Sequence, residues 1–287
     1  MGKIPRIIFY FLFFIDKITI KLFKKSYLIF FKELWENNSY TELKILDNKL
    51  KFFTPNKTTR WRVDTLFSKE PETIDWINNF DNKSKIVFWD IGSNIGLYSI
   101  YASIKFDNIN VISFEPSTSN LRILSRNISI NNLGNKIKIN QLPLSDEANK
   151  YETMHESEFI EGYSMHTFGK NLNFQGENIN SKNSYKILGT SINYLIENNI
   201  AEFPNYIKID VDGLEHIILN GGLKYLSDQR LRSISVELNE NFKDQYNQVL
   251  NIMEKSNFKM KQKKRSDSFY NKDQSKVFNY IFEKNEN

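Results

Sequence analysis

The chain has 287 residues, of which 40% are hydrophobic, so it can bury a sizeable core and is not a largely disordered chain. Its 39 basic and 34 acidic residues leave a net charge of only +5, and the lysines are scattered along the chain, which argues against a nucleic-acid partner. The sequence has no cysteine, which excludes disulfides, thiolate metal sites and a cysteine nucleophile, and agrees with a cytoplasmic enzyme.

Residues 1–40 predict an amphipathic helical extension. The nine apolar or aromatic residues 7–15 are too few to span a bilayer, which takes roughly 20 residues. The lysines between 17 and 32 fall near one helical stripe and the aliphatic residues fall elsewhere, as in a helix with a basic face and a broad apolar face. Two alternatives stay open for residues 1–35: packing on the chain's own domain or on a second subunit, and peripheral attachment to an anionic inner membrane face.

Residues 41–70 predict a hairpin that leads into the main domain, residues 71–287. Residues 41–63 alternate around a turn at Asp47 and Asn48. We expect a structural role for the neighbouring Trp61 and its two flanking arginines, with the substrate entrance as the alternative.

The chain is organised around residues 86–96. The apolar run 86–89 is typical of a central parallel strand that is covered on both faces. Asp90 stands at the end of this strand, and Gly92 and Gly96 then bracket a short turn before a helix. Such a turn brings backbone N–H groups and a helix N-terminus close to a ligand, although many α/β domains need a tight turn there for structural reasons alone.

The following unit favours a ribose-containing cofactor. Residues 110–116 predict a second buried strand, and its acid, Glu115, comes nineteen residues after Gly96, where a carboxylate can accept hydrogen bonds from two ribose hydroxyls. The dinucleotide fingerprint would need glycine at 94 and glycine or alanine at 97, but the chain has Asn94 and Leu97. The pattern therefore favours S-adenosyl-L-methionine over NAD.

Residues 150–189 form a polar insertion after a third strand, predicted over 137–144. An insertion of this length inside an α/β domain indicates a functional lid or strand pair rather than an idle connection. It holds His155, for which we expect a solvated side chain, and His166, for which we expect contact with the substrate.

Two further buried strands are predicted beyond Thr190, the expected cap of a helix that runs to about residue 199. The strand 206–211 ends in an acidic cluster that includes Asp210, and the strand 233–238 carries Glu237 near its end. Open α/β sheets bind ligands beyond the carboxyl ends of their strands, so these acids should share one crevice with the acids of the first two strands. The segments 258–264 and 277–282 alternate like an antiparallel edge pair joined by a polar loop.

The run Phe-Trp-Asp-Ile-Gly-Ser-Asn-Ile-Gly-Leu-Tyr-Ser-Ile at 88–100 resembles the first motif of the FkbM family of S-adenosylmethionine-dependent methyltransferases. Further motifs fit in order: Ser113-Phe-Glu-Pro with Asn120 and with Asn127 to Leu133, then Leu144-Ser-Asp, then Ile207-Lys-Ile-Asp-Val-Asp-Gly-Leu-Glu with Gly221 and Gly222, and Val236-Glu-Leu-Asn. The resemblance covers about 60–240. It implies a class I methyltransferase fold, a Rossmann-like doubly wound α/β sheet with an antiparallel C-terminal edge pair, and O-methylation of a sugar or polyketide hydroxyl. One departure is Asp212, where the family more often has glutamate.

These observations predict an S-adenosyl-L-methionine-dependent O-methyltransferase acting on a saccharide, with a homo-oligomer left open. The alternatives are an NAD-dependent sugar-modifying oxidoreductase and a non-catalytic binding module. Asp210 is the first candidate for the base that takes the hydroxyl proton and His166 the second, and a divalent ion on Asp210 and Glu237 ranks lower because no ligand motif is evident. By the resemblance, Asp146 lies near the adenine, with a plain turn aspartate as the alternative. The expected cofactor-binding residues are Asp90, Gly92, Asn94, Gly96, Glu115 and Asp146.

Overall fold

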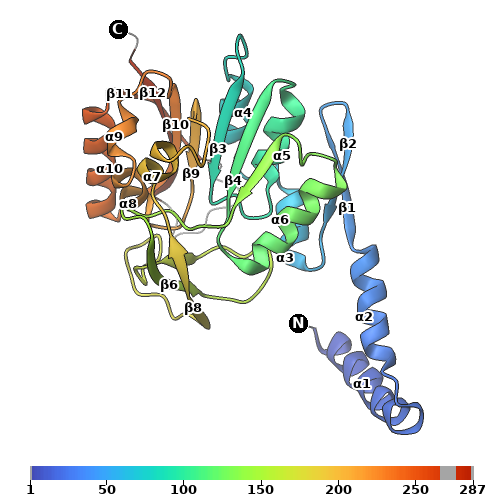
Figure 1. Ribbon diagram of the computed structural model, residues 1–287. Coiled ribbons are helices and arrows are strands. Elements are labelled where there is room, and N and C mark those ends of the chain that lie inside the picture. The colour runs from blue at the N-terminus through green and yellow to red at the C-terminus, as the bar shows by residue number, and fades with distance from the viewer. Residues whose placement is uncertain (1, 266–275, 286–287) are drawn as a thin grey trace.

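The computed structural model describes residues 2–265 and 276–285. Within these ranges a seven-stranded sheet has the order β11-β12-β10-β9-β3-β4-β5 (Figure 1). Its parallel strands are β3 (Ile86–Ile91), β4 (Ile109–Phe114), β5 (Ile137–Asn140), β9 (Tyr206–Ile209) and β10 (Ser233–Asn239). The edge strands β11 (Phe258–Lys264) and β12 (Val277–Lys284) are antiparallel, which confirms the predicted edge pair; most of the loop between them lies outside the described residues.

Helices cover both faces of this sheet, and the burial of β3 shows why. Ile86 and Phe88 belong to one hydrophobic cluster, and Val87 and Trp89 to another, because successive side chains of a strand point to opposite faces. One cluster is completed by α4 (Pro71–Asn78), α5 (Leu97–Lys105) and α6 (Thr118–Ile130). The other is completed by α7 (Ile192–Glu197), α8 (Glu215–Asn220), α9 (Leu223–Leu226) and α10 (Lys243–Lys255). The sheet is therefore doubly wound, as the sequence predicted.

The predicted hairpin is shorter than expected. Strands β1 (Tyr40–Ile45) and β2 (Asn48–Phe53) pair around the expected turn, but residues 57–64 form the helix α3 (Lys57–Asp64) instead of a strand. Asn56 caps α3 by accepting from the Thr59 N–H, and the Thr59 hydroxyl accepts from the Asn56 N–H. This reciprocal capping gives hydrogen-bond partners to backbone N–H groups that are otherwise unpaired at a helix N-terminus, and it therefore favours a helix here.

The N-terminal extension forms two helices rather than one. α1 (Lys3–Phe23) and α2 (Tyr27–Asn38) are separated by a turn in which Lys24 adopts a left-handed conformation. Asp16 of α1 fixes the turn, because its carboxylate accepts from the Ser26 hydroxyl at 2.8 Å and from the Leu28 N–H at 2.9 Å. No residue of α1 or α2 belongs to the hydrophobic clusters of the described chain. Of the alternatives left open by the sequence, packing of this extension against the core of its own domain is not seen, and a second subunit and a membrane surface remain.

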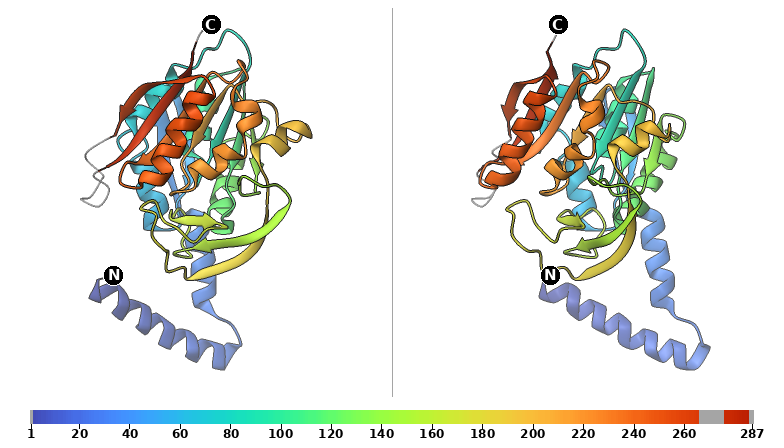
Figure 2. Two further views of the ribbon diagram at one scale, coloured as in Figure 1. Left: turned by 90° about the vertical axis from the view of Figure 1, so that its left-hand side faces the viewer. Right: turned by 60° about the vertical axis from the view of Figure 1, so that its left-hand side comes forward.

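The insertion over 150–189 is a separate three-stranded antiparallel sheet. Its strands are β6 (Lys150–Glu156), β7 (His166–Phe168) and β8 (Asn183–Gly189), in the order β7-β6-β8. Figure 2 shows this small sheet at the same end of the domain as α1 and α2. The helix that follows is capped by Ser191 and not by Thr190, because the Ser191 hydroxyl accepts from the Tyr194 N–H.

Candidate active site

A cavity of about 320 Å³ lies between the carboxyl ends of β3, β4 and β9 and the small sheet of the insertion. Its volume falls in the range of about 300–1,000 Å³ that is usual for small-molecule sites. The wall combines residues from the sequence-predicted site with others from α3 and the insertion. Of the predicted residues, the cavity brings together Gly92, Asn94, Glu115, His166 and Asp210.

Glu115 is held in the cavity wall by two backbone donors. Its Oε2 accepts from the Asn94 N–H at 2.8 Å and its Oε1 accepts from the Ser117 N–H at 2.9 Å. Burial raises the pKa of Glu115 to about 7, against the opposing effect of these two donors. Each carboxylate oxygen has a further lone pair. The carboxylate is thus held at the cavity with acceptor capacity to spare, which fits a cofactor that carries a ribose.

Gly92 lets the ends of β3 and β9 meet. Its φ is +80°, and a Cβ there would lie 1.9 Å from the carbonyl oxygen of Asp210. Only glycine avoids both the conformational strain and this overlap. The backbone of the turn at Gly92 therefore contacts the backbone of Asp210, the residue that we expect near the methyl acceptor.

The structure places three predicted site residues outside the cavity wall. Asp90 is fully buried behind it, where Oδ2 accepts from the Ser99 hydroxyl at 2.6 Å and Oδ1 has no hydrogen-bond partner among the described residues. Gly96 faces Leu124 and shapes the start of α5. Asp146 lines a different cavity of about 240 Å³. Spacing along the chain does not show which side chain reaches the cavity surface, and the cofactor contacts of these three residues stay predictions.

Asp210 carries its charge next to a buried cation. Its Oδ2 accepts from the Lys208 ammonium at 2.8 Å, and the side chain of Lys208 is only 2% exposed. Burial alone would raise the pKa of Asp210, but the charges of Lys208 and Lys69 outweigh burial and hold it below its ordinary value. Asp210 is therefore an ionised carboxylate with low affinity for a proton.

Three further acids lie around Asp210. Asp212 has φ +59°, and its Oδ2 accepts from the Met165 N–H at 2.5 Å; burial and the Asp210 charge raise its pKa to about 6. Burial and Asp210 also raise the pKa of Glu237 well above its ordinary value. Glu215 turns away to accept from the N–H groups of residues 211 and 213. No group of three or more acids and histidines among the described residues could hold a metal ion, which gives no support to the divalent-ion hypothesis.

His166 presents a neutral ring to the cavity. It lies in β7 opposite Glu156 of β6, and neither of its ring nitrogens has a hydrogen-bond partner within residues 2–265 and 276–285. Burial lowers the pKa of His166, and the nearby Glu156 charge only partly opposes this effect. A neutral imidazole with a free nitrogen can accept a proton. His155, by contrast, does not line this cavity.

Arg62 enters the wall from α3, together with Trp61, as the alternative interpretation of that cluster at the substrate entrance expected. Sequence reasoning missed Lys69, from the loop after α3, and Tyr163, from the insertion. The Tyr163 carbonyl accepts from the side-chain amides of Asn94 at 2.9 Å and Asn120 at 3.1 Å. Asn120 was visible as part of a family motif. Lys69 and Tyr163 carried no local signal, because only the packing of distant segments brings them to the sheet.

The strand order, the glycine turn after β3 and the acid after β4 define a class I S-adenosyl-L-methionine-dependent methyltransferase. Residues 90–260 match the family model of the methyltransferase FkbM domain. The chain belongs to this family, which confirms the resemblance seen in its motifs and identifies S-adenosyl-L-methionine as its cofactor.

One curated relative and several solved structures are similar to the chain. Methyltransferase sdnD of Sordaria araneosa is 37% identical over 59 residues, a match that covers 21% of this chain and 23% of that protein. The structure of M. jannaschii TYW2 in complex with AdoMet is 13% identical, with 86% of this chain and 87% of that chain covered and a TM-score of 0.43. A precorrin-6y C5,15-methyltransferase from Geobacter metallireducens is also 13% identical, with 75% and 86% covered and a TM-score of 0.41.

Proposed function

We propose that the chain transfers the methyl group to an oxygen atom, a hydroxyl of a saccharide or glycan precursor. The observation that carries this proposal is His166, a buried neutral imidazole without a partner in the described structure, in the same cavity as the Glu115 carboxylate. A sugar hydroxyl is a poor nucleophile, so its methylation gains from a base that takes the proton during attack, by about 10²- to 10⁴-fold.

We propose the opposite ranking of the two base candidates. Asp210 is paired with Lys208 and its pKa is lowered, so it is a weak proton acceptor. We propose His166 as the base and Asp210 as the group that orients the hydroxyl and balances positive charge. In this arrangement the acceptor proton moves to a ring nitrogen of His166, and the Glu156 charge nearby favours the imidazolium that forms.

The bound cofactor supplies an electrophilic methyl group on a sulfonium. Glu115 and the turn at Gly92 and Asn94 would hold the adenosyl part of the cofactor against the ends of β3 and β4. Alignment of oxygen, carbon and sulfur can supply about 7–11 kcal/mol of the barrier through proximity alone. The chain's main task is therefore to position the two reactants.

The acids around Asp210 support a polyhydroxyl acceptor. Asp210 is ionised, whereas the pKa of Glu237 is raised well above its ordinary value, so the site combines a carboxylate acceptor with a carboxyl group that favours its proton-donating form. Hydroxyl groups both donate and accept, and this mixture suits them.

We also propose a cytoplasmic location, which the absence of cysteine supports.

The test is methyl transfer from S-adenosyl-L-methionine across a panel of cell-surface glycans, followed by mass spectrometry of the products. We expect a mass gain of one CH₂ unit on a glycan and O-methyl sugars after hydrolysis. His166→Asn should lower turnover by about 10²- to 10⁴-fold while cofactor affinity is kept. Methylation of nitrogen or carbon in the product, or full turnover of His166→Asn, would refute the proposal.

A further inference from the structure

The helix α1 carries its positive charges on one side. Lys3, Arg6, Lys17 and Lys21 are all exposed, and at about 100° per residue they fall within an arc of about 60°. Lys24 and Lys25 continue this basic stripe in the turn before α2. Residues 1–40 hold seven basic and three acidic residues, so they account for four of the five net positive charges of the chain.

The remaining surface of α1 is apolar and exposed to solvent. Between residues 7 and 15 each side chain is apolar or aromatic, and each is at least 39% exposed. α2 adds a second apolar surface, with Phe31 57% and Trp35 71% exposed. Such a contiguous apolar surface marks an interaction site rather than a solvated helix.

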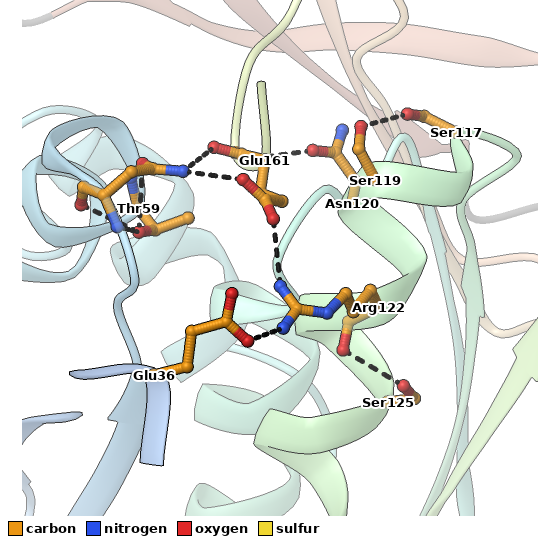
Figure 3. Close-up of polar contacts among 10 residues, drawn as sticks. Glu36, Thr59, Ser117, Ser119, Asn120, Arg122, Ser125 and Glu161 are labelled. Atoms are coloured by element: carbon orange, nitrogen blue, oxygen red, sulfur yellow. Dashed lines mark hydrogen bonds and ion pairs between the residues drawn. The ribbon is translucent and has the colours of Figure 1, made fainter. Parts of the chain in front are cut away.

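The two helices are held as one unit. The buried carboxylate of Asp16 joins α1 to the first turn of α2, as described above. At the other end of α2, Glu36 pairs with Arg122 of α6 at 2.7 Å, and Arg122 also pairs with Glu161 of the insertion at 2.9 Å (Figure 3). The extension is thus joined to the loop that carries Tyr163 and Ser164 into the cavity.

We infer that α1 and α2 dock on the surface of an anionic lipid bilayer. A narrow basic stripe beside a broad apolar surface is the pattern of a helix that lies in the interfacial plane, with its lysines at the headgroups and its apolar side chains in the acyl boundary. A second protein copy would cover one side of α1, whereas the apolar residues extend around most of the helix. Within the described residues, no helix has the length and apolar character needed to cross a bilayer.

The docked orientation turns the insertion toward the lipid. Figures 1 and 2 show α1, α2 and the small sheet β6-β7-β8 at one end of the domain, which is the end where the carboxyl termini of the parallel strands line the cavity. The acceptor would then be a saccharide presented at the membrane surface. This consequence rests on the proposed function, whereas the docking itself does not.

The test is co-sedimentation of the 287-residue chain with vesicles. One set of vesicles contains phosphatidylcholine alone, and the other also contains about 30% phosphatidylglycerol, which gives it the negative surface charge of an inner leaflet. The variant Lys17→Glu/Lys21→Glu should lose at least about tenfold in affinity for the anionic vesicles, since each lysine near such a surface contributes about 1 kcal/mol. The matched control, Lys243→Glu/Lys255→Glu on α10, should bind as the wild type does. Ile8→Ser/Leu12→Ser, on the side of α1 opposite the lysines, should weaken binding as well.

Calorimetry with S-adenosylhomocysteine, in the absence of vesicles, should show the same cofactor affinity for every variant, because none of these residues belongs to the core or the cavity. A failure of docking would therefore be distinguishable from a failure of the proposed function. Equal binding to neutral and anionic vesicles, or no sedimentation, would overturn the inference. Light scattering that showed a dimer dispersed by Ile8→Ser/Leu12→Ser would overturn it too, in favour of a second copy.

Discussion

Glu115→Gln should weaken cofactor binding more than its small change in shape suggests. The carboxylate accepts from the N–H groups of Asn94 and Ser117, and the side chain of Asn120 also stabilises its charge, so a ribose would use the acceptor capacity that remains on the two oxygens. An amide keeps a single oxygen, so one charged hydrogen bond is lost and the other becomes neutral. Hydrogen bonds to charged groups contribute about 1.5–3 kcal/mol, so we expect a total loss of about 2–4 kcal/mol, or about 30- to 1,000-fold in Kd.

The assay is isothermal titration calorimetry with S-adenosylhomocysteine at pH 8, where Glu115 is mostly ionised because its pKa is about 7. The wild-type affinity should fall as the pH drops through 7, because the charged acceptor is then protonated, and the Gln variant should show no such fall. Glu147→Gln is the matched control, since Glu147 lines a different cavity, and its Kd should stay within about threefold of the wild type. A Kd for Glu115→Gln that is also within threefold would refute the assignment of the ribose acceptor.

Three other changes test the interior of the site. Lys208→Met removes the buried partner of the Asp210 charge and should lower the free energy of unfolding, measured by urea denaturation, by about 3–5 kcal/mol. Lys224→Met breaks an exposed pair with Glu197 and should lower that free energy by less than about 1 kcal/mol. Gly92→Ala should lower the free energy of unfolding by at least about 1–3 kcal/mol and should lower turnover, because the new Cβ displaces the Asp210 backbone. Gly134→Ala, where a Cβ meets no other atom, should change neither quantity, and equal effects of the two substitutions would contradict this reasoning. Asp210→Asn should keep cofactor affinity, measured by calorimetry, and lower turnover less than His166→Asn does; the opposite order would restore Asp210 as the base.

The sheet and the cofactor turn could be predicted because their signals are local. The apolar run at 86–89 can only be buried on both faces, and the residues at the ends of parallel strands meet at one edge of the sheet. Glu115 and Asp210 could therefore be placed at the cavity from the sequence, and His166 could be placed there because it lies in a long polar insertion. The helical capping by Asn56 and Thr59 was also a local signal, and the alternation of the preceding residues concealed it.

The remaining features depend on contacts between distant segments. Arg62 reaches the cavity only because α3 packs beside the sheet, and nothing in its neighbourhood distinguishes it from the exposed Arg60. The turn between α1 and α2 is fixed by Asp16, which lies ten residues before its partner Ser26. The depression of the pKa of Asp210 comes from Lys208 and Lys69 together, and Lys69 is 141 positions away, as the numbering shows. No periodicity or motif contains such information.

The carbonyl of Tyr163 has a kinetic consequence. It is held at once by Asn94, whose backbone N–H steadies Glu115, and by Asn120 on α6. A cofactor that binds at Glu115 should therefore also fix the position of the segment from Tyr163 to His166. We expect an ordered mechanism in which the methyl donor associates before the sugar and its demethylated product departs last, so that this product inhibits competitively against the donor.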